Sequence, residues 1–450
     1  MGKDLEFISQ YCKNLAFEKI PESTVREVKL RLIDSIGCAI NAYAHEPSTT
    51  VRRLCFPTGA PLTARVIGSL MYTTLEMAAF ANSTMVRSLD FNDVYHVKSP
   101  THPSDGIAAV LAMGEALHSD GKSLITGIVL NYEMHVPFVE RTPVGLGWDG
   151  CAITATLGSA VGAGKLLGLS KEQFANAVAF AVVPNNTLMM RIVGELSTYK
   201  ELYAGMASRQ GIFAALLARE GLTGPGESIG GSAGLEKMIT GPMQWEPLGG
   251  DGVQYAIERT NIKKFPAIAQ AQIFIKTAIE LGKKLPVKDI KEIKIKTQSF
   301  GMITANSPEL RMPKTKETAD HSSIASVAIA LLDGDVTPNS WIRERFLDED
   351  VIELMCRIHV EEELEFTKEF PAKNHCLIEA VTNNGKTESV HTIVKGAVAN
   401  DVWTDEDIEH RYIKLTNDIL TPGQVSASLE VIWHLEDVKD VGLILDQLKI

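Results

Sequence analysis

Two histidines and three aspartates are concentrated between residues 89 and 106, in the segment LDFNDVYHVKSPTHPSDG. The acids are Asp90, Asp93 and Asp105, and the histidines are His96 and His102. Histidine titrates near neutral pH, so a histidine held beside a carboxylate suits proton transfer. The same side chains bind several metals, but their spacing matches no compact motif such as H-E-x-x-H. Acid–base or substrate-binding chemistry and a purely structural polar loop both remain open, whereas the spacing disfavours a metal site.

Further along the chain, cationic side chains recur that could bind a carboxylate. Lys200 lies in STYKELYAGMASRQG, and Lys263 and Lys264 precede a Phe-Pro pair in NIKKFPAIAQAQ. Arg191, in MMRIVGE, has the forked guanidinium that grips a carboxylate with two hydrogen bonds. His321, in TADHSS, falls at the start of an expected helix. The structural alternatives are a solvated helix lysine at position 200 and a hinge with exposed lysines at 263 and 264.

Composition limits the classes of function. The formal charge is −12 with no basic cluster, which argues against nucleic acid as a partner. Six scattered cysteines without a C-x-x-C pair argue against zinc ribbons and fit a reducing compartment. No G-x-S-x-G elbow or phosphate-binding G-x-x-x-x-G-K-[ST] loop occurs. The N-terminal residues carry charges where a signal peptide needs an apolar run, and the longest apolar run contains Lys165, so we expect a cytoplasmic protein with no membrane span.

These residues must be positioned by two kinds of secondary structure. Residues 1 to about 261 show helical periodicity, as at Val25, Val28, Leu32 and Ile36. From about 262 the segment IKEIKIKTQ favours a strand, although its alternation is imperfect, and Asn384-Gly385 predicts a hairpin turn. Helical texture returns after about 396. We therefore expect a mainly α protein with an α+β part: a large helical domain from 1–261 and 396–450, and a smaller α+β lid domain from 262–395.

Local signals predict where individual helices begin and end. Ser23 or Thr24 is expected to cap one helix, and Ser170 with Gln173 forms a capping box. A helix is expected to begin near Ser104 or Asp105, with Asp105 as its cap and Gly121 just past its end. The segment HSSIASVAIALLDG predicts a helix that Gly334 stops.

Taken together, these segments resemble the 2-methylcitrate dehydratase family, also called the MmgE/PrpD family. The resemblance rests on LDFNDVY and THPSD, followed in order by GAGKLLGLS, YKELYAGMASRQG, KKFPAIAQAQ and TADHSSIASVAIALLDG. It implies a helical domain with a smaller lid domain, an active site in the cleft between them, and a homodimer. The activities it implies are dehydration of 2-methylcitrate or citrate-like acids, decarboxylation of cis-aconitate and epimerisation of iminodisuccinate, all without a metal or other cofactor.

Residue by residue, the resemblance implies catalytic roles for His102, Asp93 and Lys200. The substrate-binding residues are expected to be Arg191, Lys263, Lys264, His321 and Asp90. Three positions depart from the family pattern: Asp149 stands where many members have a histidine after Gly-Trp, Gln270 lies near the place of another histidine, and Ala325 lies near that of a tyrosine. These departures leave the substrate open.

The resulting expectation is a cofactor-independent lyase that dehydrates 2-methylcitrate or a related hydroxy polycarboxylate. His102 is expected to be the acid–base group, with Asp93 orienting it or sharing its proton, and the cations are expected to bind carboxylates. A decarboxylase or an epimerase using the same site is the nearest alternative. A non-catalytic binding protein on the same scaffold is a third possibility.

Overall fold

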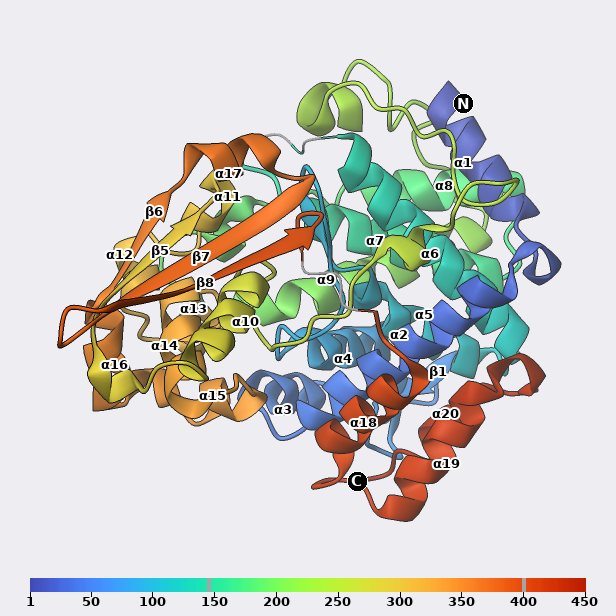
Figure 1. Ribbon diagram of the computed structural model, residues 1–450. Coiled ribbons are helices and arrows are strands. Elements are labelled where there is room, and N and C mark those ends of the chain that lie inside the picture. The colour runs from blue at the N-terminus through green and yellow to red at the C-terminus, as the bar shows by residue number, and fades with distance from the viewer. Residues whose placement is uncertain (143, 145–146, 399–401) are drawn as a thin grey trace.

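The computed structural model describes residues 1–142, 144, 147–398 and 402–450, which form two lobes (Figure 1). The larger lobe is helical and contains both chain termini, whereas the smaller lobe carries the sheet. Helix α7 packs against both α6 and α9 at the centre of the large lobe, and α4 and α8 also contact α9. The long helices of this lobe are α1 (Lys3–Asn14), α2 (Glu22–Asn41), α3 (Glu46–Arg53), α4 (Leu75–Arg87), α5 (Ile107–Ala116), α6 (Gly121–Arg141), α7 (Gly150–Leu166), α8 (Lys171–Val182) and α9 (Tyr199–Arg219).

Small residues make the centre of the large lobe possible. α7 is buried from Gly150 to Gly164 and supplies Gly158 and Gly162 to the contact with α6. A side chain at Gly162 would meet the backbone oxygen of Gly127 at 2.9 Å, so the two helices approach closely only because glycine stands there. None of the described helices is long and apolar enough to cross a membrane.

The small lobe is built on a four-stranded sheet with the order β6-β5-β7-β8. The strands are β5 (Ile290–Thr297), β6 (Ile358–Glu362), β7 (Lys373–Thr382) and β8 (Thr387–Lys395). β5 and β6 are parallel, and the other two pairs are antiparallel. Two short hairpins lie in the large lobe: β1 (Thr63–Arg65) with β2 (Tyr72–Thr74), and β3 (Tyr95–His96) with β4 (Pro100–Thr101).

Helix α10 packs on β7 and β8 and also against α14, and these elements share a second apolar core. The helices of this lobe are α10 (Ala271–Gly282), α11 (Ser299–Met302), α12 (Pro308–Arg311), α13 (Lys316–Ala319), α14 (Ser323–Asp333), α15 (Pro338–Ile342), α16 (Glu349–Cys356) and α17 (Leu364–Glu369). The chain then returns to the large lobe through α18 (Asp405–Thr416), α19 (Pro422–Trp433) and α20 (Gly442–Asp446), where α18 packs on α2 (Figure 1).

Most of the predicted elements are confirmed. The strand expected in IKEIKIKTQ is β5, and its imperfect alternation has a cause: the pairing register with β7 shifts between Ile290 and Glu292. Gly385 lies in the β7–β8 turn with a φ of 81°, and Gly334 ends α14 in the left-handed conformation. The Ser170 capping box is present. The predicted domain limits at 261/262 and 395/396 stay predictions.

Three local predictions are wrong. Pro21 precedes α2, and Ser23 and Thr24 donate to Glu258 instead of capping the helix. Gly121 begins α6, with Asp120 as its cap, because the previous helix has already ended at Ala116. Asp105 caps no helix: a 3₁₀ turn at Pro103–Gly106 precedes α5, and the Asp105 carboxylate is bonded elsewhere.

Candidate active site between the two lobes

His102 directly follows β4 of the β3–β4 hairpin and is buried within the large lobe. Its Nδ1 lies 2.7 Å from the backbone oxygen of Asp93. A carbonyl oxygen only accepts hydrogen bonds, so Nδ1 carries the proton and Nε2 keeps its lone pair. Burial, together with repulsion from Arg87 and Lys263, holds the pKa of His102 well below its usual value. The side chain is therefore a neutral imidazole that can accept a proton at Nε2.

Asp93 fixes this loop with its carboxylate. Oδ1 accepts hydrogen bonds from the Ser104 amide at 3.0 Å and the Ser104 hydroxyl at 2.6 Å. Oδ2 accepts from the Tyr132 hydroxyl at 2.7 Å and lies 3.6 Å from Arg31 Nε. Asp93 thus touches His102 through its backbone carbonyl, while its carboxylate anchors the loop around it.

Asp90 contacts several cationic side chains. It follows α4 with a φ of 49° and accepts hydrogen bonds from Arg87 and from Lys263, whose Nζ lies 2.5 Å from Oδ1. Its other oxygen lies 3.8 Å from Lys200 Nζ and 3.7 Å from His321 Nδ1. Burial opposes its charge, but Arg87, Lys263 and Lys200 outweigh that effect and hold the pKa of Asp90 well below its usual range.

The small lobe contributes Asp320 and His321, which lie between α13 and α14. Lys200, on α9 of the large lobe, donates to Asp320 Oδ2 at 2.6 Å and is fully buried, so it is not a solvated helix lysine. His321 Nδ1 lies 2.6 Å from Asp320 Oδ1, which fixes its proton on Nδ1. Burial and Lys200 lower the pKa of His321. A second neutral imidazole therefore adjoins the group formed by Asp90 and its cations.

A further ion pair, next to Asp320, was not predicted from the sequence. Lys316, on α13, binds Glu201 and donates to the Ser88 backbone oxygen at 2.6 Å. Its Nζ also lies 3.5 Å from Asp320. Glu201 directly follows Lys200, and Lys316 precedes Asp320 by four residues, so adjacency and helical spacing were the available signals.

The assembled group brings four cationic side chains together, and Asp105 and Glu317 are further carboxylates near them. Four cationic side chains face three carboxylates across the contact between the lobes: Arg87, Lys200, Lys263 and Lys316 against Asp90, Asp320 and Glu201. The two histidines are neutral. Four neighbouring cations suit an anion with several oxygens, which would take the place of their present carboxylate partners.

Two of the predicted cations do not pair with the carboxylates of this group. Arg191 is buried and pairs with Asp149, using Nε and also Nη2 at 3.0 Å, and its guanidinium lies 4.1 Å from the centre of the Tyr203 ring. The departure at Asp149 thus neutralises the arginine expected to bind a carboxylate. Lys264 is exposed and lines a different groove, although Lys263 beside it is buried in the group.

Asp90, Asp320 and His321 could also hold a metal ion, since each offers one ligand atom within 4.8 Å of the others. In this arrangement the two carboxylates accept hydrogen bonds from Lys200 and Lys263. A divalent ion would have to displace both ammonium groups, whose charge it would also repel. The donor set therefore fits a lysine-bridged anion site better than a metal centre.

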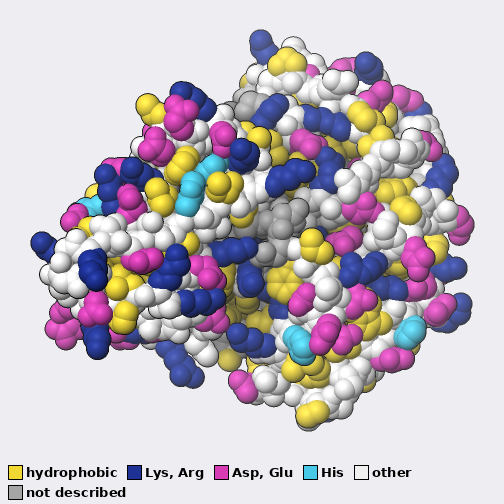
Figure 2. Space-filling model, viewed as in Figure 1, with side chains coloured by type: hydrophobic (Ala, Val, Ile, Leu, Met, Phe, Trp, Pro, Cys, Tyr) yellow, Lys and Arg dark blue, Asp and Glu magenta, His cyan; other side chains and the backbone are white. Residues whose placement is uncertain are grey.

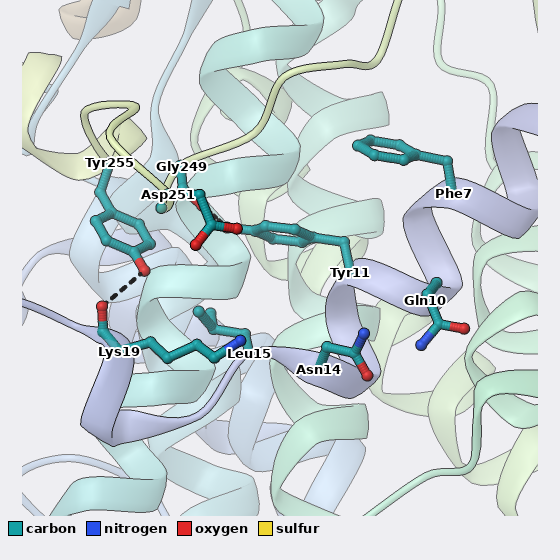
Figure 3. Close-up of a pocket in the computed structure, with 10 residues that line it drawn as sticks. Phe7, Gln10, Tyr11, Asn14, Leu15, Lys19, Gly249, Asp251 and Tyr255 are labelled. Carbon is teal, nitrogen blue, oxygen red and sulfur yellow. Dashed lines mark hydrogen bonds between the residues drawn. The ribbon is translucent and has the colours of Figure 1, made fainter.

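Two of the open cavities lie away from this group. A groove of about 690 Å³ runs between the lobes and is lined by Phe91, Lys264, Trp403 and Arg411, among others, and Figure 2 shows a hollow with hydrophobic and cationic side chains between the lobes. A pocket of about 450 Å³ lies between α1 and the loop around Gly249 (Figure 3). In it the Tyr11 hydroxyl points at Gly249, and the charged lining residues are Lys19 and Asp251. Neither lining contains the histidines or the paired lysines described above.

Two family models match the two parts of the chain. The family model described as the MmgE/PrpD N-terminal domain matches residues 6–248, and that of the MmgE/PrpD C-terminal domain matches residues 265–437. The chain is 25% identical to a cis-aconitate decarboxylase of Homo sapiens, over 83% of this chain and 79% of the relative. It is 26% identical to a mitochondrial 2-methylcitrate dehydratase of Yarrowia lipolytica, over 87% of this chain and 78% of the relative. A 2-methylcitrate dehydratase of Escherichia coli O157:H7 is 26% identical over 75% and 74% of the two chains. The two matching models span most of the sequence, and the chain belongs to the MmgE/PrpD family.

Proposed function

We propose that the protein is a lyase that dehydrates 2-methylcitrate or a related hydroxy polycarboxylate without a cofactor. The observation that carries the proposal is the cluster of buried cations next to two histidines whose Nε2 atoms can accept protons. Relatives named 2-methylcitrate dehydratase support the reaction class. The homodimer implied by the resemblance and the cytoplasmic location expected from the sequence remain predictions.

The reaction divides among the side chains as follows. Nε2 of His102 takes a proton from the carbon next to a substrate carboxylate. Lys200 stabilises the negative charge that develops on that carboxylate as the C–H bond breaks. Lys263, whose pKa burial lowers to about 8, gives its proton to the hydroxyl on the adjacent carbon, which leaves as water while the carbon–carbon double bond forms. The products are an unsaturated acid and water, and exchange of one proton each with solvent returns His102 to its neutral form and Lys263 to its protonated form.

Access to this site requires movement of the lobes. Lys200 and Lys263 are fully buried. Lys200 links the large lobe to Asp320 of the small lobe, and Lys263, at the junction of the lobes, binds Asp90 of the large lobe. A polycarboxylate can replace the carboxylates of Asp90 and Asp320 as partner of these lysines only when the small lobe moves away. Closure over the substrate then excludes water and strengthens each ionic contact.

The test is turnover of a panel of hydroxy polycarboxylates by the purified protein, followed by the absorbance of the conjugated alkene. His102→Gln retains a side chain of similar size but cannot act as a base. We expect it to lower kcat by about 10²- to 10⁴-fold, the usual contribution of a positioned base. An unchanged kcat in His102→Gln on a responsive substrate would remove His102 from the mechanism, and no alkene from any acid in the panel would reject the dehydratase.

A decarboxylase on the same site is the second candidate, because a relative is named cis-aconitate decarboxylase. Both reactions build negative charge next to a carboxylate, so the same lysines serve both. Release of carbon dioxide from cis-aconitate, measured beside alkene formation from 2-methylcitrate, separates the two. Solvent deuterium incorporated without either product would indicate epimerisation.

A further inference from the structure

One helix holds the chain on both sides of His102. On α6, Asn131 Nδ2 donates to the backbone oxygen of Pro103 at 2.8 Å, and His135 Nδ1 lies 2.7 Å from the Thr101 hydroxyl. Asn131 and His135 are four residues apart and therefore share one helical face. Between them, the Tyr132 hydroxyl donates to the carboxylate of Asp93, the residue whose carbonyl accepts the His102 proton.

The direction of the hydrogen bonds at Thr101 can be assigned. The Thr154 hydroxyl donates to the Gly150 carbonyl at 2.8 Å, so the Thr101 hydroxyl donates to Thr154 Oγ1, also at 2.8 Å. Thr101 Oγ1 then accepts from His135, which places the His135 proton on Nδ1. Burial lowers the pKa of His135 to about 3, so this ring stays neutral and the hydrogen bonds keep one direction through the neutral pH range.

The Asn131 amide is held by two glycines. A Cβ on Gly106 or on Gly158 would collide with Asn131 Oδ1, and a Cβ on Gly158 would also lie 2.8 Å from His135 Nε2. Neither glycine has a positive φ, so close approach explains its presence. The close contact with the two glycines leaves the Asn131 carboxamide one orientation, with Nδ2 directed at Pro103.

We propose that Asn131, Tyr132 and His135 are positioning residues that hold His102 as the Nδ1–H tautomer with Nε2 turned to the substrate. The proposal rests on the proton transfer by His102 proposed above, and it adds three residues whose hydrogen bonds go to Pro103, Asp93 and Thr101. Their effect passes through the peptide on either side of His102 and through the Asp93 carbonyl. A displacement of about 1 Å in a reacting group can cost on the order of 100-fold in rate, so loss of one of these contacts changes catalysis more than substrate binding.

Two nearly isosteric variants test the proposal. Tyr132→Phe removes the bond to Asp93, and Thr101→Val removes the link between His135 and Thr154. Tyr412→Phe is the matched control, because Tyr412 is equally buried and its hydroxyl also makes one buried hydrogen bond, to Ser428, between α18 and α19. The readouts are kcat and KM on a responsive polycarboxylate, and the ¹⁵N shifts of the His102 ring, assigned by difference from His102→Gln.

We expect Tyr132→Phe and Thr101→Val to lower kcat by about 10-fold or more while KM changes less than about 2-fold, since Lys200 and Lys263 are untouched. The His102 ¹⁵N shifts should move from a single tautomer toward a mixture in both variants, and the control should leave kcat and shifts unchanged. The proposal is overturned if the His102 shifts of both variants equal those of the wild type, or if Tyr412→Phe reproduces their effects. The ¹⁵N measurement needs no turnover, so it decides the positioning role even if no polycarboxylate is a substrate.

Discussion

The buried pair of Lys200 and Asp320 links the two lobes, and its strength can be measured with a double-mutant cycle. Lys200 Nζ lies 2.6 Å from Asp320 Oδ2, and both residues are fully buried. At an effective dielectric constant of about 20, two unit charges at this separation attract by about 6 kcal/mol, before the cost of removing both from water. Removing one partner of a buried pair usually costs about 3–5 kcal/mol.

The neighbouring groups reduce this cost. Asp320 retains His321 at 2.6 Å and Lys316 at 3.5 Å when Lys200 is replaced, so we expect Lys200→Met to destabilise by about 3 kcal/mol. Asp320→Asn leaves Lys200 with Asp90 at 3.8 Å, and we expect a similar loss. The double variant should lose less than the sum, with a coupling energy of about 2 kcal/mol.

The assay is equilibrium unfolding in urea at pH 7, followed by circular dichroism and by tryptophan fluorescence. At this pH the contribution of Asp320 is fully present. Its pKa in the folded state is lowered, because Lys200 and Lys316 outweigh the effect of burial, so the stabilisation exists above the unfolded pKa and is lost as pH falls through the folded pKa.

An exposed pair in the same chain is the matched control. Lys283 and Glu280 also lie 2.6 Å apart, but their side chains are 64% and 50% exposed. We expect Lys283→Met and Glu280→Gln to couple by less than about 0.5 kcal/mol. If the coupling of Lys200 with Asp320 is equally small, the pair does not hold the lobes together and the reasoning from burial is refuted.

Three further predictions concern the site. Lys263→Met should abolish measurable turnover because it removes a buried proton donor. Lys264→Met should leave kcat/KM within about 2-fold because its side chain is exposed in another groove. Equal losses in the two variants would contradict this assignment. Burial raises the pKa of the Asp105 carboxyl to about 6. The free energy of unfolding should therefore fall by about 3 kcal/mol in total as pH rises from about 4 to about 6. A ¹³C carboxyl titration should show the midpoint near 6, and a midpoint below 4 would contradict this prediction. Gly158→Ala should destabilise by about 1–3 kcal/mol and lower kcat, because its Cβ collides with Asn131, whereas Gly423→Ala, which meets nothing within 4 Å, should not; urea midpoints of the two variants give the comparison.

The local elements of this protein follow from its sequence because their signals are local. Apolar periodicity at Val25, Val28 and Leu32 predicts α2, and Asn384-Gly385 predicts the β7–β8 turn. The helix ends are less predictable, because Ser23 and Thr24 find a partner in Glu258, which lies more than 200 residues away in the chain. Such a competition between a cap and a tertiary contact leaves no trace in a short window of sequence.

The sequence by itself also determined the residue types that could do chemistry, since segments around Asp93, His102, Lys200 and Lys263 match a known order of motifs. Only the tertiary structure decided how they are used. It turned the Asp93 carboxylate to Ser104 and Tyr132, paired Arg191 with Asp149, and separated Lys263 from Lys264 beside it. It also brought Lys316 and Glu201 behind Asp320 and placed one face of α6 around His102. The reason is physical: a buried charge or hydrogen-bonding group must find partners, and those partners come from whichever distant segments the packing of the two lobes places within about 3 Å.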